Sequence, residues 1–191
     1  MKAKRELILQ SVLELFMADG INGLKVSKIA SHANIGKGTV YEYFRSKDEL
    51  FLGAVEYGLS RLAGIVDEKL SEAKGFEESF KALADCIITI TRQGPLISSL
   101  SDAKGMPFSG ETIIKLKDIM QKAQLSFLTT LSEILETGVK EGLIKTKGDM
   151  NLQKAMLIIM TNLSVQHAHS GNTDYNELRL FYYDACLKLF S

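Results

Sequence analysis

Basic residues gather in one short stretch of a chain that is neutral overall. The 191 residues balance 23 Lys and Arg against 23 Asp and Glu. Segment 25–47 departs from this balance, because its one acidic residue, Glu42, lies among Lys25, Lys28, Lys37, Arg45 and Lys47. A local excess of cations indicates an anionic partner such as nucleic acid, although a solvated basic surface has the same composition. Thr39, Tyr41 and Tyr43 add hydroxyl groups, which also bind phosphate oxygens.

No residue pattern of a catalytic or metal site accompanies these cations. The sequence lacks the GxSxG, HExxH, P-loop and dinucleotide-binding glycine motifs. His167 and His169 are two residues apart and would point to different faces of a helix, whereas helical metal ligands are four apart; His32 stands alone. We therefore predict that the chain is not an enzyme and holds no metal or cofactor.

The cysteines and the apolar runs bear on where the protein works. Cys86 and Cys186 form no CxxC pair, which is typical of a reduced intracellular chain. The longest unbroken apolar run, 155–160, is far shorter than the ~20 residues that a membrane span needs. The basic N-terminus resembles the start of a signal peptide, but the following residues are interrupted by Gln10, Ser11 and Glu14. We predict a soluble cytoplasmic protein with no membrane contact.

The spacing of apolar residues predicts an all-α fold of about nine helices. Gly and Pro residues divide the chain into helices up to Gly20, over 26–33, 37–44, 47–73, 75–93, 111–141, 151–170 and 175–190, with a short helix and a mobile loop in 96–110. The first helix is expected to bury Leu7, Ile8, Val12, Leu15 and Phe16. Ser46 is expected to cap the helix over 47–73, whose buried side is expected to hold Leu50, Phe51, Ala54, Val55, Leu59, Leu62, Ile65, Val66 and Leu70.

The last two helices are apolar on two sides, which means that both sides of each helix must pack against other elements. No Lys, Arg, Asp or Glu occurs from residue 155 to residue 173. A fully internal position explains one such helix but not two consecutive ones, so we predict a two-fold homodimer interface built as a four-helix bundle. Its predicted residues are Leu157, Ile158, Ile159, Val165, Phe181, Tyr182, Ala185 and Leu189.

Segment 26–47 has the layout of a helix-turn-helix unit, with two short helices joined by a tight turn at 34–36. The apolar side chains that would hold the two helices together are Ile29, Ala30, Ile35, Val40 and Phe44. The residues left exposed on the second helix are expected to be Lys37, Gly38, Thr39, Tyr41, Glu42, Tyr43 and Arg45. Cations, hydroxyls and a helix N-terminus together suit binding in a DNA groove.

The most distinctive run is Gly36-Lys37-Gly38-Thr39-Val40-Tyr41-Glu42-Tyr43-Phe44, followed by Ser46-Lys47-Asp48-Glu49-Leu50. Together with Ile8, Leu15-Phe16, Gly20, Ile29-Ala30 and Ala33, it makes residues 5–55 resemble the DNA-binding domain of the tetracycline-repressor (TetR) family of bacterial transcriptional regulators. The resemblance covers about a quarter of the chain. It implies a three-helix DNA-binding domain over 1–46, with the helix-turn-helix at about 27–46, and a helical effector-binding and dimerisation domain over 47–191.

The resemblance also implies roles for particular residues. Contacts with double-stranded DNA would come from Ser27, Lys28, Lys37, Gly38, Thr39, Tyr41, Tyr43 and Lys47. Base reading would fall to Thr39, Tyr41 and Lys37. Two positions depart from the family pattern, since Lys25 and Gly36 stand where capping hydroxyls are usual. The Lys25 side chain cannot accept a hydrogen bond from a backbone N–H, so we expect Ser27 to cap its helix and the helix to begin a residue or two later.

The expected mechanism is repression of transcription. A dimer binds a (pseudo)palindromic operator, and a small molecule that binds the dimer releases it from the DNA. The effector is unknown, and the Met and Phe content favours an apolar or aromatic one. Its candidate contacts are Cys86, Thr89, Gln124, Phe127, Met156, Met160, Asn162 and His167, for each of which ordinary core packing is the alternative. The alternative is a DNA-binding regulator that is controlled by a protein partner and not by a small molecule. Such a regulator would lack an enclosed cavity of a few hundred Å³.

Overall fold

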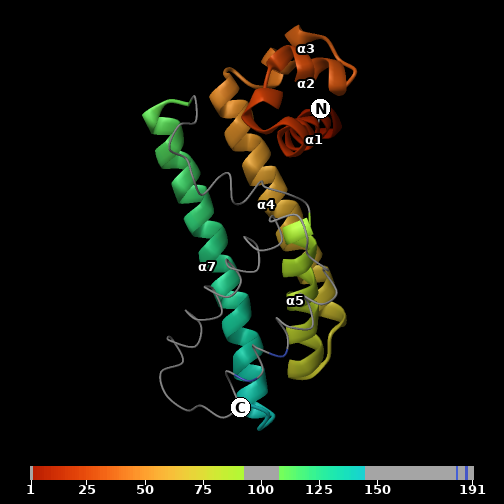
Figure 1. The fold of residues 1–191 in the computed structure, drawn as a ribbon, viewed down its shortest axis with the longest axis vertical. Helices are drawn as coiled ribbons and strands as arrows, with labels where there is room; N and C mark the ends of the chain where they lie inside the picture. Colours follow the sequence, from red (N-terminus) through yellow and green to blue (C-terminus); the bar gives the residue numbers. More distant parts are fainter. Residues whose placement is uncertain (1, 93–107, 145–183, 185–187, 189–191) are drawn as a thin grey trace. The chain divides into compact units, whose positions relative to one another are not determined.

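The computed structural model describes residues 2–92, 108–144, 184 and 188 (Figure 1). These residues form six α-helices, one 3-10 helix and no strand, which confirms the all-helical prediction for this part of the chain. The elements are α1 (Lys2–Asp19), η1 (Gly20–Gly23), α2 (Val26–His32), α3 (Lys37–Tyr43), α4 (Lys47–Glu72), α5 (Gly75–Arg92) and α7 (Gly110–Lys140). The helices predicted over 151–170 and 175–190, and the short one before residue 108, lie outside the described residues.

The described residues fall into two compact units. The first contains residues 2–62 and 108–122, and the second contains residues 63–92 and 123–144. Helices α4 and α7 each contribute their N-terminal part to the first unit and their C-terminal part to the second.

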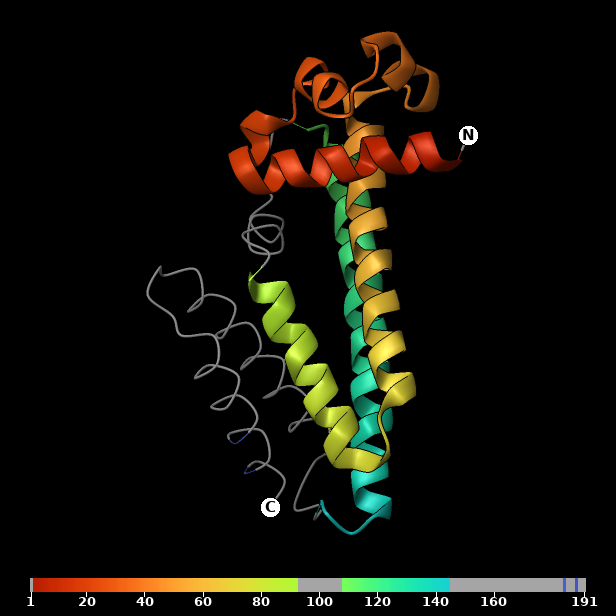
Figure 2. The same ribbon diagram turned by 90° about the vertical axis from the view of Figure 1, so that its right-hand side faces the viewer.

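The core of the first unit joins the three N-terminal helices to the beginnings of α4 and α7. Figure 2 shows α1 lying across the N-terminal part of α4 at a steep angle. The fully buried side chains are Ile8, Leu9, Val12 and Phe16 of α1, Leu24, Ile29, Ala30, Val40 and Phe44 of the helix-turn-helix segment, Leu50, Phe51, Ala54 and Val55 of α4, and Leu116 of α7. Burial of this many apolar groups is the main stabilising contribution to the unit.

The buried stripe of α1 differs from the predicted one. Leu7 is 44% exposed, whereas Leu9, which the prediction omitted, is fully buried. Leu9 packs beside Gly53 of α4, where a Cβ would lie 3.4 Å from Leu9 Cδ2. The side of α1 that faces the core is therefore shifted from the predicted one. Ile65 of α4 is likewise 37% exposed rather than buried.

The second unit packs α5 against the C-terminal part of α7. Its core consists of Phe76, Phe80, Leu83, Ala84 and Ile87 of α5, Leu131, Ile134 and Leu135 of α7, and Ile144. The two helices approach closely at Gly138, where a Cβ would lie 2.8 Å from the Phe76 ring. Glu141 Oε2 accepts a hydrogen bond of 3.1 Å from the Phe76 backbone N–H and so holds the start of α5 to the end of α7.

None of the described helices is both long enough and apolar enough to cross a lipid bilayer.

Candidate nucleic-acid interface

The turn between α2 and α3 is fixed by backbone hydrogen bonds. Asn34 adopts a left-handed conformation with φ of 53°, which asparagine tolerates better than most residues. The N–H of Ile35 donates to Ala30 O at 2.9 Å, and the N–H of Asn34 donates to Ser31 O at 3.1 Å. This pair of bonds is the Schellman motif, which ends a helix abruptly and redirects the chain. The predicted break at 34–36 is therefore confirmed.

Buried side chains hold α3 against the rest of the unit. Val40 is 1% exposed and Phe44 is 2% exposed, as the sequence predicted. The Arg5 guanidinium of α1 lies 5.3 Å from the centre of the Phe44 ring, within the range of a cation–π contact. Because one side of α3 is anchored in this way, its opposite side faces solvent.

The solvent-facing side of α3 carries most of the residues expected there. Lys37, Gly38 and Glu42 are exposed, and the exposed fraction of Tyr41 is 48%. A Cβ at Gly38 would have no atom within 4 Å, so the backbone at this point is open to close approach.

Thr39 and Tyr43 were predicted to be exposed, but both are half-buried. The Tyr43 ring packs against the core of the first unit. Residue 43 follows Val40 by three positions and so lies partly on the buried side of the helix, which explains the difference. Both side chains are still partly exposed and can contact a partner.

The start of α2 contradicts the prediction that Ser27 takes over capping. The helix begins at Val26, and Lys25 is the N-cap residue without any side-chain cap bond. The Lys25 backbone itself is in place for this role, because its C=O accepts from the Ile29 N–H at 3.0 Å and its N–H donates to Gly23 O at 2.9 Å. Ser27 is consequently an exposed residue of the first turn.

Lys28, one turn from the α2 start, has an acidic neighbour. Its Nζ lies 2.9 Å from Asp19 Oδ2, and both side chains are nearly half exposed. Ion pairs at such exposed positions contribute little to stability. The Lys28 ammonium can therefore exchange this partner for another anion at small cost.

The link between α3 and α4 is held by reciprocal capping. Ser46 Oγ accepts a hydrogen bond of 3.0 Å from the Glu49 N–H, as expected for the N-cap of α4. Glu49 Oε2 accepts one of 2.7 Å from the Arg45 N–H. The arrangement resembles a capping box, which fixes the angle at which a chain enters a helix. The beginning of α4 is thereby fixed relative to the end of α3.

Lys47, the first residue of α4, lies beside an aromatic stack. Its Nζ is 5.7 Å from the centre of the Phe108 ring. Phe108 in turn stacks on Phe51 of α4, with ring centroids 4.4 Å apart and an interplanar angle of 14°. The Lys47 side chain is half-buried, so its ammonium has a preferred position before any partner binds.

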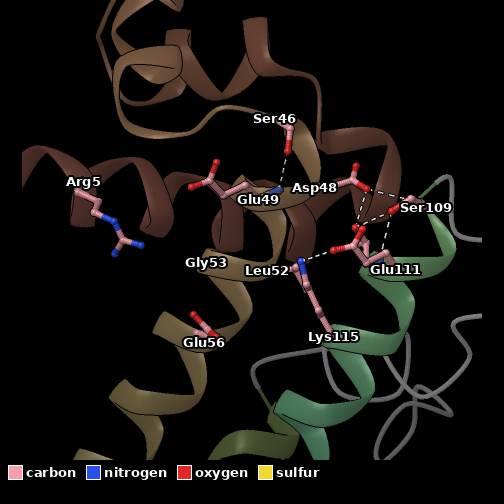
Figure 3. A pocket seen from close by; sticks show the side chains of 11 residues that line it. Arg5, Ser46, Asp48, Glu49, Leu52, Gly53, Glu56, Ser109, Glu111 and Lys115 are labelled. Carbon is pink, nitrogen blue, oxygen red and sulfur yellow. Dashed lines mark hydrogen bonds and ion pairs between the residues drawn. The ribbon is translucent and has the colours of Figure 1, made fainter.

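A polar cleft of about 490 Å³ lies between α1 and the starts of α4 and α7 (Figure 3). Charged side chains dominate its walls, which are formed by Arg5, Ser46, Asp48, Glu49, Leu52, Gly53, Glu56, Ser109, Glu111, Thr112 and Lys115. Lys115 Nζ lies 2.6 Å from Glu111 Oε1, four residues earlier on α7. This is not the apolar effector cavity that the sequence led us to expect, since none of the predicted effector contacts lines it.

Asp48 ties α4 to α7 at the edge of this cleft. Its Oδ2 accepts hydrogen bonds from Thr112 Oγ1 at 2.7 Å and from the Ser109 N–H at 3.2 Å. The bond from Thr112 is the main reason why the pKa of Asp48 lies below its usual value, with smaller contributions from Ser109 and from the charge of Lys47. Ser109 also caps α7, because its Oγ accepts from the Thr112 N–H at 3.2 Å.

The contacts of Asp48 were not predicted from the sequence. A serine three residues before Thr112 is a usable signal for the start of a helix. Nothing in the sequence connects that helix start with residue 48.

The residues predicted to contact an effector are only partly described. Cys86 of α5 is buried, and burial raises the pKa of its thiol. Phe127 of α7 is half-buried and packs against the core of the second unit, whereas Gln124 is exposed. Thr89 belongs to α5, but its side chain lies outside the description, as do Met156, Met160, Asn162 and His167.

The residues predicted for a dimer interface also lie outside the described part of the chain. These are Leu157, Ile158, Ile159, Val165, Phe181, Tyr182, Ala185 and Leu189.

Comparison with known proteins identifies the helix-turn-helix segment. Residues 8–54 match the model of bacterial regulatory proteins of the tetR family. The HTH-type transcriptional regulator YhgD of Bacillus subtilis is 25% identical over 142 residues, which cover 74% of this chain and 72% of that protein.

Solved structures share the fold over nearly the whole chain. FadR from Bacillus subtilis, in complex with stearoyl-CoA, matches with a TM-score of 0.73 at 19% identity, covering 97% of this chain and 98% of that one. A transcriptional regulator from Saccharomonospora viridis, in complex with choline, matches with a TM-score of 0.82 at 17% identity, covering 96% of this chain and 95% of that one. Residues 8–54 of this chain therefore match the helix-turn-helix segment of the tetR family of bacterial regulatory proteins, and the chain shares the fold of these solved structures.

Proposed function

We propose that this chain is a transcriptional repressor that binds a (pseudo)palindromic operator as a homodimer and is released by a small molecule. Residues 1–46 would bind the DNA, and residues 47–191 would bind the effector and form the dimer. The observation that carries the proposal is the exposed side of α3, where Lys37, Gly38 and Tyr41 face solvent on a helix whose other side is anchored in the core.

Phosphate contacts and base contacts are expected from different residues. Phosphates carry most of the affinity but no sequence information, so exposed cations and hydroxyls beside α3 suit that role. We assign it to Ser27, Lys28, Tyr43 and Lys47. Base edges in the major groove would be read by Lys37, Thr39 and Tyr41, with Gly38 allowing the backbone to approach.

The proposed dimer presents two copies of α3 to one face of the duplex. Recognition helices of two-fold dimers contact half-sites one helical turn apart, about 34–36 Å. The two apolar C-terminal segments of the sequence are the proposed interface. A change in the separation of the two α3 helices then prevents both half-sites from being bound together.

The contacts around Asp48 offer a route by which an effector could act. Asp48 and the stacked pair Phe51 and Phe108 join the start of α7 to the start of α4. Any effector-induced shift of the α7 start relative to α4 changes the surroundings of Lys47. Couplings of about 1–3 kcal/mol between two sites change occupancy roughly 5- to 150-fold, so a modest preference for the displaced state is sufficient.

The proposed effector is apolar or aromatic. Aromatic and aliphatic side chains line the contact between α5 and α7, among them the buried Phe80 and the half-buried Phe127. Proteins of the same fold are bound to stearoyl-CoA in one structure and to choline in another, so the fold accepts ligands of very different polarity. Both compounds are therefore useful probes.

Binding of the full chain to a duplex that spans the DNA upstream of its own gene tests the proposal. In a fluorescence-anisotropy titration at several salt concentrations, Lys47→Ala should weaken binding and reduce the salt slope by about 1. Lys74→Ala, which removes an exposed lysine of the second unit, is the matched control and should leave both quantities unchanged.

The effector part of the proposal has its own test. Addition of stearoyl-CoA, choline or an aromatic acid to the preformed complex should identify a compound class that weakens DNA binding. Tighter binding in the presence of a compound contradicts release by an inducer. A complex that no compound weakens favours the alternative in which a protein partner controls the regulator.

A further inference from the structure

A carboxylate, that of Glu42, lies on the exposed side of α3 in the last turn of the helix. Successive residues of a helix are about 100° apart, so Gly38 and Glu42 share one face. Each is two positions from the buried Val40 and therefore lies on the opposite side of the helix from it. Both are exposed. If the exposed side of α3 faces the base edges in a DNA groove, the Glu42 carboxylate also lies in the groove.

The fold does not use this carboxylate. No hydrogen bond or ion pair to Glu42 is present among the residues that the structure describes, which include the nearby cations Lys37 and Arg45. Two other acidic residues of the same unit do have partners, since Glu49 caps the Arg45 N–H and Asp48 binds Thr112. Glu42 is therefore available to an external partner.

An acidic residue at this position opposes general DNA binding. The phosphates repel a carboxylate, and a carboxylate that is desolvated without a partner costs several kcal/mol. Base edges that accept hydrogen bonds, such as guanine O6 and N7, offer no compensation. The available partners are the amino groups, which are N4 of cytosine and N6 of adenine.

Cytosine fits a carboxylate better than adenine does. The adenine amino group lies next to N7, an acceptor that repels the second carboxylate oxygen, whereas the edge of cytosine presents its N4 donor alone. We propose that Glu42 is a specificity-determining residue that accepts a hydrogen bond from N4 of a cytosine in each half-site of the operator. This inference rests on the proposed function and names one base that α3 reads.

The neighbouring glycine makes such a contact sterically possible. A Cβ at Gly38 would have no neighbour within 4 Å, so the backbone one turn before Glu42 can approach the base edges. Sequences without cytosine at this position leave the carboxylate unpaired beside the phosphates and are disfavoured. Glu42 thus lowers affinity for other sequences as well as raising preference for the correct one.

Selection from a library of randomised DNA duplexes tests the inference with the full chain. Wild-type protein should enrich sites with two symmetric half-sites and one fixed cytosine in each. Glu42→Gln should enrich adenine at that position, because an amide both accepts from N6 and donates to N7 of adenine. Glu42→Ala should lose the preference there, and Glu56→Gln, an exposed glutamate of α4, should retain the wild-type pattern.

Binding constants on single defined duplexes give the expected size. Exchange of cytosine for adenine at this position should reduce wild-type affinity about tenfold and should increase that of Glu42→Gln by a similar factor. Since residue 42 is exposed, both variants should fold, and thermal unfolding by circular dichroism verifies this.

The possible outcomes distinguish a failure of the inference about Glu42 from a failure of the proposed function. If Glu42→Gln raises affinity equally for every duplex and selects the same bases as wild type, Glu42 reads no base and the inference is wrong. If wild-type protein enriches no sequence at all, the proposed function itself is contradicted. A changed base at any other position in both Glu42 variants also contradicts a direct contact with cytosine.

Discussion

Asp48 of α4 accepts a hydrogen bond of 2.7 Å from the Thr112 hydroxyl of α7, although the two residues are 64 positions apart in the sequence. Thr112 is 5% exposed, so its hydroxyl has little access to water and depends on this partner. The bond joins the first turns of two helices next to the link from α3. It therefore connects the candidate DNA-binding segment with the start of α7.

Removal of the Thr112 hydroxyl is expected to destabilise the first unit. Thr112→Val leaves the shape of the side chain and removes the donor, which should lower the free energy of unfolding by about 1 kcal/mol. Thr129→Val is the matched control, because the exposed Thr129 hydroxyl donates to Leu125 O of its own helix. Urea unfolding at neutral pH measures both, and equal losses in the two variants would contradict the role of Thr112.

The same contact predicts how stability depends on pH. The pKa of Asp48 lies below its ordinary value of 3.8, mainly because of the bond from Thr112. A carboxyl whose pKa is lowered by folding contributes stability above its unfolded pKa and loses that contribution as the pH falls through the folded value. Stability should thus decrease below about pH 4.

Asp48→Asn should show a smaller decrease in melting temperature than wild type between pH 5 and pH 3. The measurement is circular dichroism at a series of pH values. On a Thr112→Val background the Asp48→Asn substitution should change the pH profile much less. An equally large change on that background is the result that rules out this origin of the pH dependence.

Two helical glycines are expected to respond in opposite directions to alanine. Gly138→Ala places a Cβ 2.7 Å from Ile144 Cδ1 and 2.8 Å from the Phe76 ring, so it should destabilise by about 1–3 kcal/mol. Gly64→Ala in α4 meets no atom within 4 Å and should stabilise by about 0.5–1 kcal/mol, because alanine favours helix. Thermal unfolding compares them; stabilisation by both substitutions would show that α5 and α7 do not approach closely at Gly138.

A charge in the predicted dimer interface should produce monomers. Phe181→Asp is expected to dissociate the dimer and abolish operator binding, since one α3 alone contacts half of the site. Leu7→Asp places the same charge at an exposed leucine of α1 and should remain dimeric. Sedimentation equilibrium gives the mass of each variant. A dimeric Phe181→Asp protein would locate the interface elsewhere.

Local signals in the sequence were sufficient to predict the helix-turn-helix segment. Asn34 and Gly36 mark the turn, Ser46 marks the start of α4, and the helical period identifies Val40 and Phe44 as buried. Each of these features depends on residues within one or two turns of the helix. Periodicity and capping act over that range, which is why they can be read without the fold.

Features that depend on distant parts of the chain were not predictable in this way. Leu9 is buried instead of Leu7 because the orientation of α1 is set by the core that it forms with the other helices of the first unit. The pairing of Asp48 with Thr112 requires two helices to meet. The N-cap at Lys25 shows that the backbone around residues 23–29 begins a helix without a side-chain cap.

The central claim is that α3 lies in the major groove of duplex DNA, with its twin one helical turn away. Hydroxyl-radical footprinting of the full chain on DNA upstream of its own gene, at low salt, tests this directly. The account predicts two protected patches on one face of the duplex, separated by about 10–10.5 base pairs or a multiple of this, and their loss in a Lys37→Ala/Tyr41→Ala variant. Uniform cleavage with wild-type protein, or protection that the double variant retains, would contradict it.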